Sequence, residues 1–241
     1  DISDLLGRQE VEASENLLSR NITKKTVLIT GAGGSIGSEI SRQVSKNSPK
    51  EIILLDSNEY ALYSIKSELE RQTKDTKIYS ILGSVTNKKR MTEVHEAFDI
   101  NTVYHAAAYK HVPLVEENPF EAVSNNITGT KISAETAAEA SVETFVLIST
   151  DKAVRPTNIM GATKRFAELI LQSMSDEKQI KMTMVRFGNV IGSSGSAVPL
   201  FQQQIKEGGP VTVTHPEVTR YFMSIPEAAE LVIQAGAMGQ G

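Results

Sequence analysis

The chain has 241 residues, a hydrophobic content of 40%, a charged content of 22% and a net charge of −4. These values predict a soluble globular protein with one sizeable core, and they argue against nucleic acid as a partner. The absence of cysteine excludes disulfide bonds and thiolate zinc sites. The four histidines lack metal-ligand spacing, so we expect no metal site.

The two ends of the sequence lack the features of a complete protein. The first residue is Asp1, and the last three are Gly239-Gln240-Gly241. We expect the chain to be part of a longer protein. No apolar run approaches the ~18 residues of a membrane span, so we expect any membrane anchor to lie outside this sequence.

Short apolar runs rich in β-branched residues alternate with helical periodicity from residue 26 onwards. We expect strands at 26–30, 51–56, 77–82, 102–105, 144–150 and 182–187. Helices are expected at 36–44, 60–69, 90–98 and 124–140. Apolar strands that alternate with helices predict a parallel sheet covered on both faces. The predicted fold class is therefore α/β, with a Rossmann-type doubly wound parallel sheet.

The pattern changes after Gly188. The later sequence predicts a loop at 192–196, a helix at 198–206, short strands at 211–214 and 221–225, and a helix from Pro226 to Met238. Three regions are expected: an N-terminal arm or linker (1–24), a dinucleotide-binding Rossmann domain with the catalytic segment (25–190), and the beginning of a smaller substrate-binding region (191–241).

A glycine-rich turn joins the first strand to the first helix. Gly31, Gly34 and Gly37 have G-x-x-G-x-x-G spacing. Glycines in this place allow a tight turn and bring backbone N–H groups and the helix N-terminus to a pyrophosphate. Asp56 ends the second strand at about the 20-residue offset of a ribose-binding acid. Because a carboxylate repels a 2′-phosphate, we expect NAD, with NADP as the alternative. Asp56 could also cap the next helix.

Five segments together resemble the extended short-chain dehydrogenase/reductases; they are 31–37, 105–113, 125–130, 149–156 and 186–190. More narrowly, the chain resembles the catalytic domain of bacterial, often membrane-anchored, UDP-N-acetylglucosamine 4,6-dehydratases of surface-polysaccharide and protein-glycan biosynthesis. The likeness runs from Asp4 to Met238, and its specific parts are Thr150-Asp151-Lys152 and the Met-x-x-x-Lys segment at 160–164.

The resemblance implies a hydro-lyase that works through a tightly bound NAD(P). Hydride leaves sugar carbon 4, water is eliminated across carbons 5 and 6, and the hydride returns to carbon 6. The product is a UDP-4-keto-6-deoxy-N-acetylhexosamine. The resemblance also implies UDP-N-acetylglucosamine as substrate, a homo-oligomer, and a catalytic domain on the cytoplasmic side, at the inner face of the cell membrane.

Met160 occupies the position at which the superfamily has a catalytic tyrosine, four residues before Lys164. Methionine cannot ionise, so neighbouring residues must move the proton. The resemblance implies that Thr150 binds the carbon-4 oxygen, that Asp151 protonates the leaving hydroxyl and that Lys152 is the base at carbon 5. Lys164 would bind the nicotinamide ribose and stabilise an alkoxide. The alternatives are a solvated Asp–Lys pair and a methionine that only fills the core.

The remaining assignments concern cofactor and substrate contacts. The cofactor-binding residues are expected to be Gly31, Gly33, Gly34, Ser35, Ile36, Gly37, Asp56, Ser84, Val85, Ala106, Ala107, Ala108, Asn126 and Lys164. The substrate-binding residues are expected to be Lys110, His111, Asn189, Val190 and Arg220. An arginine suits a diphosphate, although Arg220 could instead pair with Glu217.

Two other functions stay open. A UDP-N-acetylhexosamine 4-epimerase on the same fold needs no acid at carbon 6, and Asp151 argues against it. A non-catalytic dinucleotide-binding module is the third reading; the retention of Thr150, Asp151, Lys152 and Lys164 argues against that. The fold alone does not separate the three.

Overall fold

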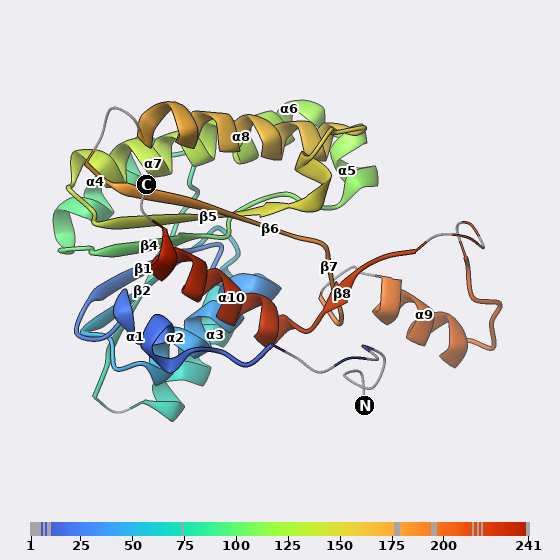
Figure 1. The fold of residues 1–241 in the computed structure, drawn as a ribbon, viewed down its shortest axis with the longest axis horizontal. Helices are drawn as coiled ribbons and strands as arrows, with labels where there is room; N and C mark the ends of the chain where they lie inside the picture. The colour runs from blue at the N-terminus through green and yellow to red at the C-terminus, as the bar shows by residue number, and fades with distance from the viewer. Residues whose placement is uncertain are drawn as a thin grey trace.

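The structure is a computed structural model that describes residues 6, 8, 11–73, 75–175, 179–193, 197–213, 215, 217 and 219–239. Within these residues, a six-stranded parallel sheet has the order β3-β2-β1-β4-β5-β6 (Figure 1). The strands are β1 Thr26–Thr30, β2 Glu51–Asp56, β3 Lys77–Leu82, β4 Thr102–His105, β5 Thr144–Thr150 and β6 Lys181–Phe187. The expected Rossmann-type sheet is confirmed.

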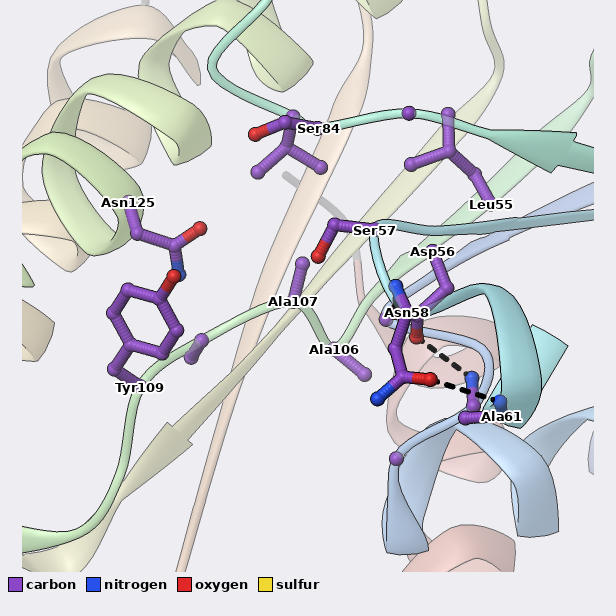
Figure 2. Close-up of a pocket in the computed structure, with 16 residues that line it drawn as sticks. Leu55, Asp56, Ser57, Asn58, Ala61, Ser84, Ala106, Ala107, Tyr109 and Asn125 are labelled. Atoms are coloured by element: carbon purple, nitrogen blue, oxygen red, sulfur yellow. Dashed lines mark hydrogen bonds between the residues drawn. The ribbon is translucent and has the colours of Figure 1, made fainter.

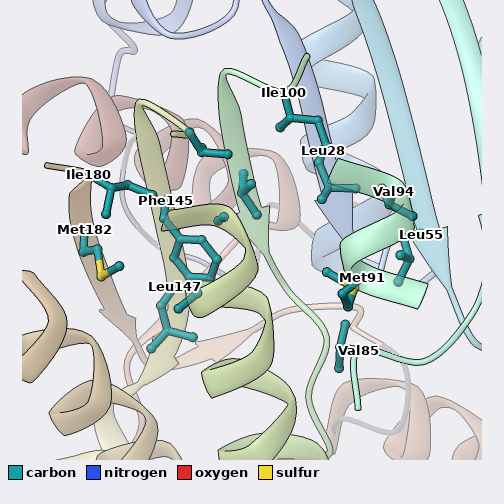
Figure 3. Close-up of a cluster of buried hydrophobic side chains, with 14 of the residues drawn as sticks. Leu28, Leu55, Val85, Met91, Val94, Ile100, Phe145, Leu147, Ile180 and Met182 are labelled. Carbon is teal, nitrogen blue, oxygen red and sulfur yellow. The ribbon is translucent and has the colours of Figure 1, made fainter. Parts of the chain in front are cut away.

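Helices cover both faces of the sheet (Figure 1). The α-helices are α1 Glu15–Arg20, α2 Ser35–Lys46, α3 Glu59–Gln72, α4 Lys88–Ala97, α5 Val112–Glu117, α6 Pro119–Ala122, α7 Gly129–Glu139, α8 Ile159–Ser175, α9 Ala197–Lys206 and α10 Ile225–Met238. Helix α9 lies apart from the sheet, beyond β7 and β8 (Figure 1). The core between the sheet and α4, α7 and α8 contains the fully buried Phe145 (Figure 3). Burial of one such side chain stabilises the fold by about 1.5–3 kcal/mol.

The register of the strands brings the candidate site residues to one edge. Thr30 pairs with Leu55 on β2 and with His105 on β4. On the next strand His105 pairs with Leu147, so β5 continues to Thr150, beyond the end of β4. Ligands bind outside the carboxyl ends of parallel strands in this architecture. The glycine-rich turn and the Thr150 segment therefore lie at the same edge of the sheet.

The helix expected at 124–140 consists of two successive segments with different helical geometry. Residues Val123–Thr128 form a π-helix, η2, and the α-helical geometry of α7 begins at Gly129. The extra residue in a π-turn rotates the side chains that precede it, and such turns occur frequently at functional sites. Hydrophobic periodicity could not distinguish this turn from a regular helix.

The region after β6 differs from the prediction. Asn189–Val190 and Phe222–Met223 form a second, two-stranded parallel sheet, β7 and β8. The strand expected at 211–214 is wrong for the described residues 211–213, which are irregular. Thr212 there bonds through its N–H and Oγ1 to the Gln204 side chain instead of to a strand. Thr214, and residues 194–196 of the expected loop, lie outside the described residues.

The strand expected at 221–225 is shorter because α10 begins within it. The Ser224 Oγ accepts a hydrogen bond from the Glu227 N–H at 3.1 Å, and Pro226 occupies the first helical turn. Both features are typical of a helix start.

α10 and the N-terminal segment both belong to the Rossmann core. Val232 and Ile233 of α10 are fully buried against the sheet face that α2 and α3 cover. Ile22 is fully buried in the same cluster, and the Asn21 Nδ2 donates to the Gly236 carbonyl at 2.8 Å. The described part of the expected arm is therefore docked, and the expected substrate-binding region includes a helix of the core. The domain boundaries themselves stay a prediction.

Candidate active site

A cavity of about 250 Å³ opens at the carboxyl ends of β1 to β4. Its walls contain nine of the residues expected to bind a cofactor (Figure 2), namely Gly31, Gly33, Gly34, Asp56, Ser84, Val85, Ala106, Ala107 and Ala108. Asp56 lies on one side of this cavity, and Tyr109 and Asn125 lie on the other (Figure 2). The arrangement suits an elongated polar ligand such as a dinucleotide.

Different constraints require glycine at different positions of the turn. Gly31 has a φ of +66°, and a Cβ on it would lie 2.6 Å from the Ala107 nitrogen. A Cβ on Gly37 would lie 2.0 Å from the Gly31 carbonyl oxygen. A Cβ on Gly34 would meet only that same oxygen, at 3.3 Å. Gly31 and Gly37 are thus required by the backbone, whereas Gly34 leaves space for a ligand.

Exchanging Gly37 and Gly34 for alanine is expected to have opposite effects. Gly37→Ala should destabilise the fold by several kcal/mol, because its methyl group overlaps backbone that cannot move cheaply. Gly34→Ala should cost no more than about 1 kcal/mol at this helix N-cap, yet weaken NAD binding at least about tenfold by blocking the approach of a phosphate to the backbone. Urea unfolding and NAD titration by calorimetry check the pair. Gly34→Ala protein with unchanged NAD affinity would contradict the assignment.

Asp56 is held ready for polar ligands. Its Oδ2 accepts from the Gly33 N–H and its Oδ1 from the Asn58 N–H, both at 2.8 Å. The cap of α3 is Asn58, whose Oδ1 accepts from the Ala61 N–H at 3.0 Å (Figure 2). The alternative use of Asp56 as the helix cap is therefore wrong. Its carboxylate oxygens retain lone pairs that can accept from ribose hydroxyls.

A second cavity, of about 510 Å³, lies beside the start of α2. Its walls include Ser35, Ile36 and Gly37 of the expected cofactor site and Lys110 and His111 of the expected substrate site. The two sets of residues therefore meet in one space. Gly34, Ala106, Ala108 and Tyr109 line both cavities, so the two cavities adjoin.

Asn126 is fully buried in the π-helix and acts on the backbone around it. Its Oδ1 accepts from the Tyr109 N–H at 2.8 Å, and its Nδ2 donates to the Tyr109 carbonyl at 2.9 Å and to the Thr163 Oγ1 at 3.0 Å. These bonds use the whole amide. Asn126 therefore positions the wall of the cofactor cavity and the residue next to Lys164, and its amide has no group left for direct cofactor contact.

A buried chain of hydrogen bonds runs from the glycine-rich turn to Asn126. The Thr30 hydroxyl lies 2.8 Å from His105 Nδ1, and His105 Nε2 lies 3.1 Å from the Thr130 Oγ1. The Thr130 hydroxyl in turn donates to the Asn126 carbonyl at 2.7 Å. Burial, with the charge of Lys164, lowers the pKa of His105 to about 3. His105 is therefore neutral, with Nδ1 accepting and Nε2–H donating.

The expected catalytic residues follow β5 directly. Thr150 Oγ1 donates to Asp151 Oδ1 at 2.9 Å, and Lys152 Nζ donates to the same oxygen at 3.1 Å. Partial burial favours the neutral acid, but the hydrogen bonds from Lys152 and Thr150 outweigh it and hold the pKa of Asp151 below its usual value. Asp151 is therefore a carboxylate at neutral pH, and the three side chains form one hydrogen-bonded group.

The start of α8 lies against this group. A Cβ on Gly161 would lie 2.3 Å from the Lys152 carbonyl oxygen, so only glycine allows the helix to come so close. Met160 beside it is buried with Val115 and Ala122 in an apolar cluster. The structure thus gives Met160 a packing role at the position of the superfamily tyrosine.

Lys164 is almost completely buried one turn further along α8. Burial lowers the pKa of its ammonium group to about 8, and the negative charge of Glu168 offsets only part of this. The charge of Lys164 contributes to the lowered pKa of His105 at the end of β4. A cation of this kind suits an anion that develops during a reaction.

The residues expected to bind the nucleotide sugar reach this region through β7 and β8. A Cβ on Gly188 would lie 3.5 Å from Asp151 Oδ2 and 3.2 Å from the Tyr221 carbonyl oxygen. Gly188 thus lies near Asp151, and it directly precedes Asn189 and Val190, which form β7 and pair with β8. Arg220 is exposed next to Tyr221 and donates to the Thr219 carbonyl at 2.9 Å, without the alternative pair to Glu217.

Sequence reasoning missed several residues that line the first cavity. They are Leu55, Ser57, Asn58, Ala61, Gly83, Tyr109 and Asn125. Gly83 follows β3 directly, so the rule that ligands bind at the carboxyl ends of strands could have found it. Asn125 comes to the cavity through the π-turn, for which the sequence has no signal.

Two further observations concern metals and membranes. Over the described ranges, no three histidine, aspartate or glutamate side chains gather closely enough to hold a metal ion. In the same part of the chain, no helix has the length and apolarity needed to cross a membrane.

Sequence comparison identifies relatives of the whole chain. A family model described as "Polysaccharide biosynthesis protein" matches residues 27–241. The chain is 57% identical, over its entire length, to the capsular polysaccharide biosynthesis protein CapD of Staphylococcus aureus, and it covers 41% of that protein. The chain thus spans about two fifths of the length of this relative.

Some of the relatives have names that state an activity. The UDP-glucose 4-epimerase of Rickettsia rickettsii is 35% identical over 88% of this chain and 62% of its own length. The UDP-N-acetylglucosamine 4,6-dehydratase (inverting) of Campylobacter jejuni is 33% identical over 87% of this chain and 63% of its own length. The expected resemblance to nucleotide-sugar dehydratases is confirmed.

Solved structures agree with this relationship. Pen from Bacillus thuringiensis has a TM-score of 0.85 and 36% identity, over 92% of this chain and 68% of that chain. DesIV, a dTDP-glucose 4,6-dehydratase from Streptomyces venezuelae, shares the fold with a TM-score of 0.76 and 21% identity, over 88% of this chain and 72% of that chain. The family match over nearly the whole sequence, the relatives and the shared Rossmann fold show that this chain belongs to the polysaccharide biosynthesis protein family.

Proposed function

We propose that the protein is an NAD-dependent UDP-N-acetylglucosamine 4,6-dehydratase. The observation that carries this proposal is the hydrogen-bonded group of Thr150, Asp151 and Lys152 at the end of β5. It supplies an acceptor, an acid and a base next to a buried lysine. The 33% identity to the Campylobacter jejuni dehydratase supports the same reaction and the same substrate class.

The cofactor we propose is NAD, bound across the two cavities. Asp56 would accept from the ribose hydroxyls, and the N-terminus of α2, which begins at Ser35 next to Gly34, would face the pyrophosphate. Lys164 would hold the nicotinamide ribose. Asp56 disfavours a 2′-phosphate, and Ser57, Asn58 and Ala61 beside it carry no positive charge to attract one. Bound NAD supplies the hydride acceptor at carbon 4 and the hydride donor at carbon 6.

Thr150 and Asp151 would together take the place of the missing tyrosine. The Thr150 oxygen receives the proton of the carbon-4 hydroxyl while its own proton passes to Asp151 Oδ1, 2.9 Å away. The positive charge of Lys164 lowers the cost of the negative charge that develops on the carbon-4 oxygen. This relay also solves a second problem. Asp151 is a carboxylate at rest and can act as an acid only after it has gained a proton.

The elimination would use the protonated Asp151 and the neutral amine of Lys152. Lys152, the ammonium partner of Asp151 at rest, would first release a proton to solvent, which leaves its amine as the base at carbon 5. The amine then takes the carbon-5 proton, the carbon-6–oxygen bond breaks, and Asp151 gives its proton to the departing hydroxyl, so water leaves. As hydride reaches carbon 6, Lys152 returns its proton to carbon 5. The proton lost from the carbon-4 hydroxyl thus leaves in the water, and Lys152 takes a proton back from solvent, so every group is restored.

Further contacts and the cellular setting follow from the same proposal. Lys110, His111, Asn189 and Val190 would hold the nucleotide sugar, and the exposed Arg220 suits its diphosphate. A homo-oligomer on the cytoplasmic side of the cell membrane, acting in surface-polysaccharide or glycan biosynthesis, fits the family to which the chain belongs.

A UDP-sugar 4-epimerase is the second candidate. The 35% identity to the Rickettsia rickettsii epimerase favours it. An epimerase must rotate a keto-sugar and return hydride to carbon 4, and it has no use for an acid at carbon 6. The hydrogen-bonded pair of Asp151 and Lys152 supports the dehydratase instead, because an epimerase needs no acid at carbon 6.

One experiment separates the candidates. The full-length protein is incubated with UDP-N-acetylglucosamine in deuterated water, and the products are analysed by NMR and mass spectrometry. A 4-keto-6-deoxy product with deuterium at carbon 5 is expected. Conversion to UDP-N-acetylgalactosamine would identify the epimerase. No turnover by a protein that contains NAD would leave only a binding module and would overturn the proposal.

A further inference from the structure

A buried carboxylate beneath the catalytic group takes no part in the steps above. Glu168, on α8, has no solvent-exposed surface. Its Oε1 accepts from the Ser149 Oγ at 2.6 Å and from the Arg186 Nε at 2.8 Å. Its Oε2 accepts from the Arg165 Nη1 at 3.0 Å and from the Arg186 Nη2.

This cluster is a costly way to attach a helix to a sheet. Burial opposes the ionisation of Glu168, but the bonds from Arg186, Ser149 and Arg165 outweigh it and lower its pKa to about 2. Apolar side chains of similar volume often replace a buried ion pair without loss of stability. Stability alone therefore does not account for this cluster.

The cluster joins the two elements that carry the proposed catalytic residues. Ser149 directly precedes Thr150 on β5, and Arg186 is its partner in register on β6. Lys164 lies on the same helix as Glu168, one turn before it. Glu168 therefore ties the end of β5 to the turn of α8 that carries the buried ammonium.

We propose that Glu168 is a positioning residue: through Ser149 and Arg186 it fixes Thr150 and Asp151 relative to Lys164. This inference rests on the proposed function of the same site. Glu168 also acts through its charge, since it favours the protonated form of Lys164. Lys164 in turn contributes to the lowered pKa of His105 on β4, which burial keeps neutral.

Glu168→Gln in the full-length protein separates positioning from a purely structural role. Gln keeps the size of the side chain and removes its charge. We expect kcat to fall about 100-fold, the effect of a misplacement of about 1 Å, with little change in the KM for the sugar. If turnover needs the Lys164 ammonium, activity is lost as pH rises through its pKa. Without Glu168 that alkaline limb should move to lower pH, which a structural role alone would not cause.

Ser149→Ala isolates the tether, because it leaves the charge of Glu168 and both arginines in place. We expect kcat to fall about tenfold through loss of alignment, with the alkaline limb unchanged. Glu39→Gln is the matched control on α2, at the opposite face of the sheet. Glu39 is also buried and accepts from Arg42 at 3.0 Å and from Gln43 at 2.9 Å. Its variant should keep the wild-type kcat and pH profile.

The outcomes decide the inference separately from the proposed function. Ser149→Ala protein with wild-type kcat, or Glu168→Gln protein with the wild-type alkaline limb, overturns it; if Glu168→Gln does not fold, Ser149→Ala decides. If the wild-type protein has no dehydratase activity, the proposed function fails. The pH dependence of unfolding then still tests whether Glu168 acts on Lys164. The increase in stability with pH that Lys164 causes should begin at lower pH in Glu168→Gln, and an unchanged onset would contradict this interaction.

Discussion

Asp151→Asn is expected to reduce dehydratase turnover by about 10³-fold without loss of the fold or of NAD binding. Asparagine keeps the shape of the side chain and can still accept from Thr150, but it cannot receive the proton at neutral pH. The ion pair with Lys152 is more than half exposed on the Asp151 side, so its loss should hardly change the free energy of unfolding. Product formation, NAD titration and thermal unfolding check the three parts of this result.

The same variant distinguishes the two roles of Asp151. In the relay through Thr150, Asp151 is needed for the first oxidation, so the variant should not accumulate reduced cofactor. If Asp151 acts only as the acid at carbon 6, the variant should oxidise the sugar and stop there, and the absorbance of reduced nicotinamide would appear. Asp99→Asn, an exposed aspartate in the loop before β4, is the matched control and should behave as wild type. Asp151→Asn protein that retains a tenth of the turnover would exclude both roles.

Lys164→Met is expected to abolish turnover and to stabilise the fold. Burial lowers the pKa of Lys164 to about 8 from 10.5, so the folded protein holds this proton less tightly than the unfolded chain. The difference corresponds to a penalty of roughly 3 kcal/mol, which the charged lysine imposes below pH 8 and which methionine removes. The buried ammonium group of Lys164 thus lowers the free energy of unfolding of the protein.

The pH dependence of unfolding tests this explanation directly. Between about pH 8 and 10.5 the unfolded chain binds the proton that the folded protein has released, so wild-type stability should rise with pH in this window. Lys164→Met should lack this rise. Lys131→Met changes an exposed lysine on α7 and should leave the wild-type profile unchanged. Urea denaturation at several pH values measures all three proteins. A Lys164→Met protein less stable than wild type at neutral pH would refute the burial argument.

The sheet and its ligand-binding edge could be predicted from the sequence because they depend on local patterns. Apolar runs such as 26–30 and 144–150 are buried on both sides, and their alternation with helices determines a parallel order. Glycine at positions 31 and 37 marks the cofactor turn because a Cβ does not fit there, and the acid at 56 has the offset of a ribose-binding residue.

Other parts of the site depend on contacts between distant segments. No local pattern shows that Asn58, and not Asp56, caps α3, or that a π-turn brings Asn125 to the cavity. The strand expected at 211–214 is wrong for residues 211–213, because an alternating pattern forms a strand only where a partner strand is in reach.

By itself the sequence determined the fold class, the cofactor turn and the place of Thr150, Asp151 and Lys152 at the end of a strand. Only the tertiary structure decided how these groups act. The bond from Thr150 to Asp151, the burial of Lys164 and the link from Glu168 to Ser149 each join atoms whose distance no pattern specifies. Protonation and acidity follow from burial and hydrogen bonds, and these exist only once the chain has folded.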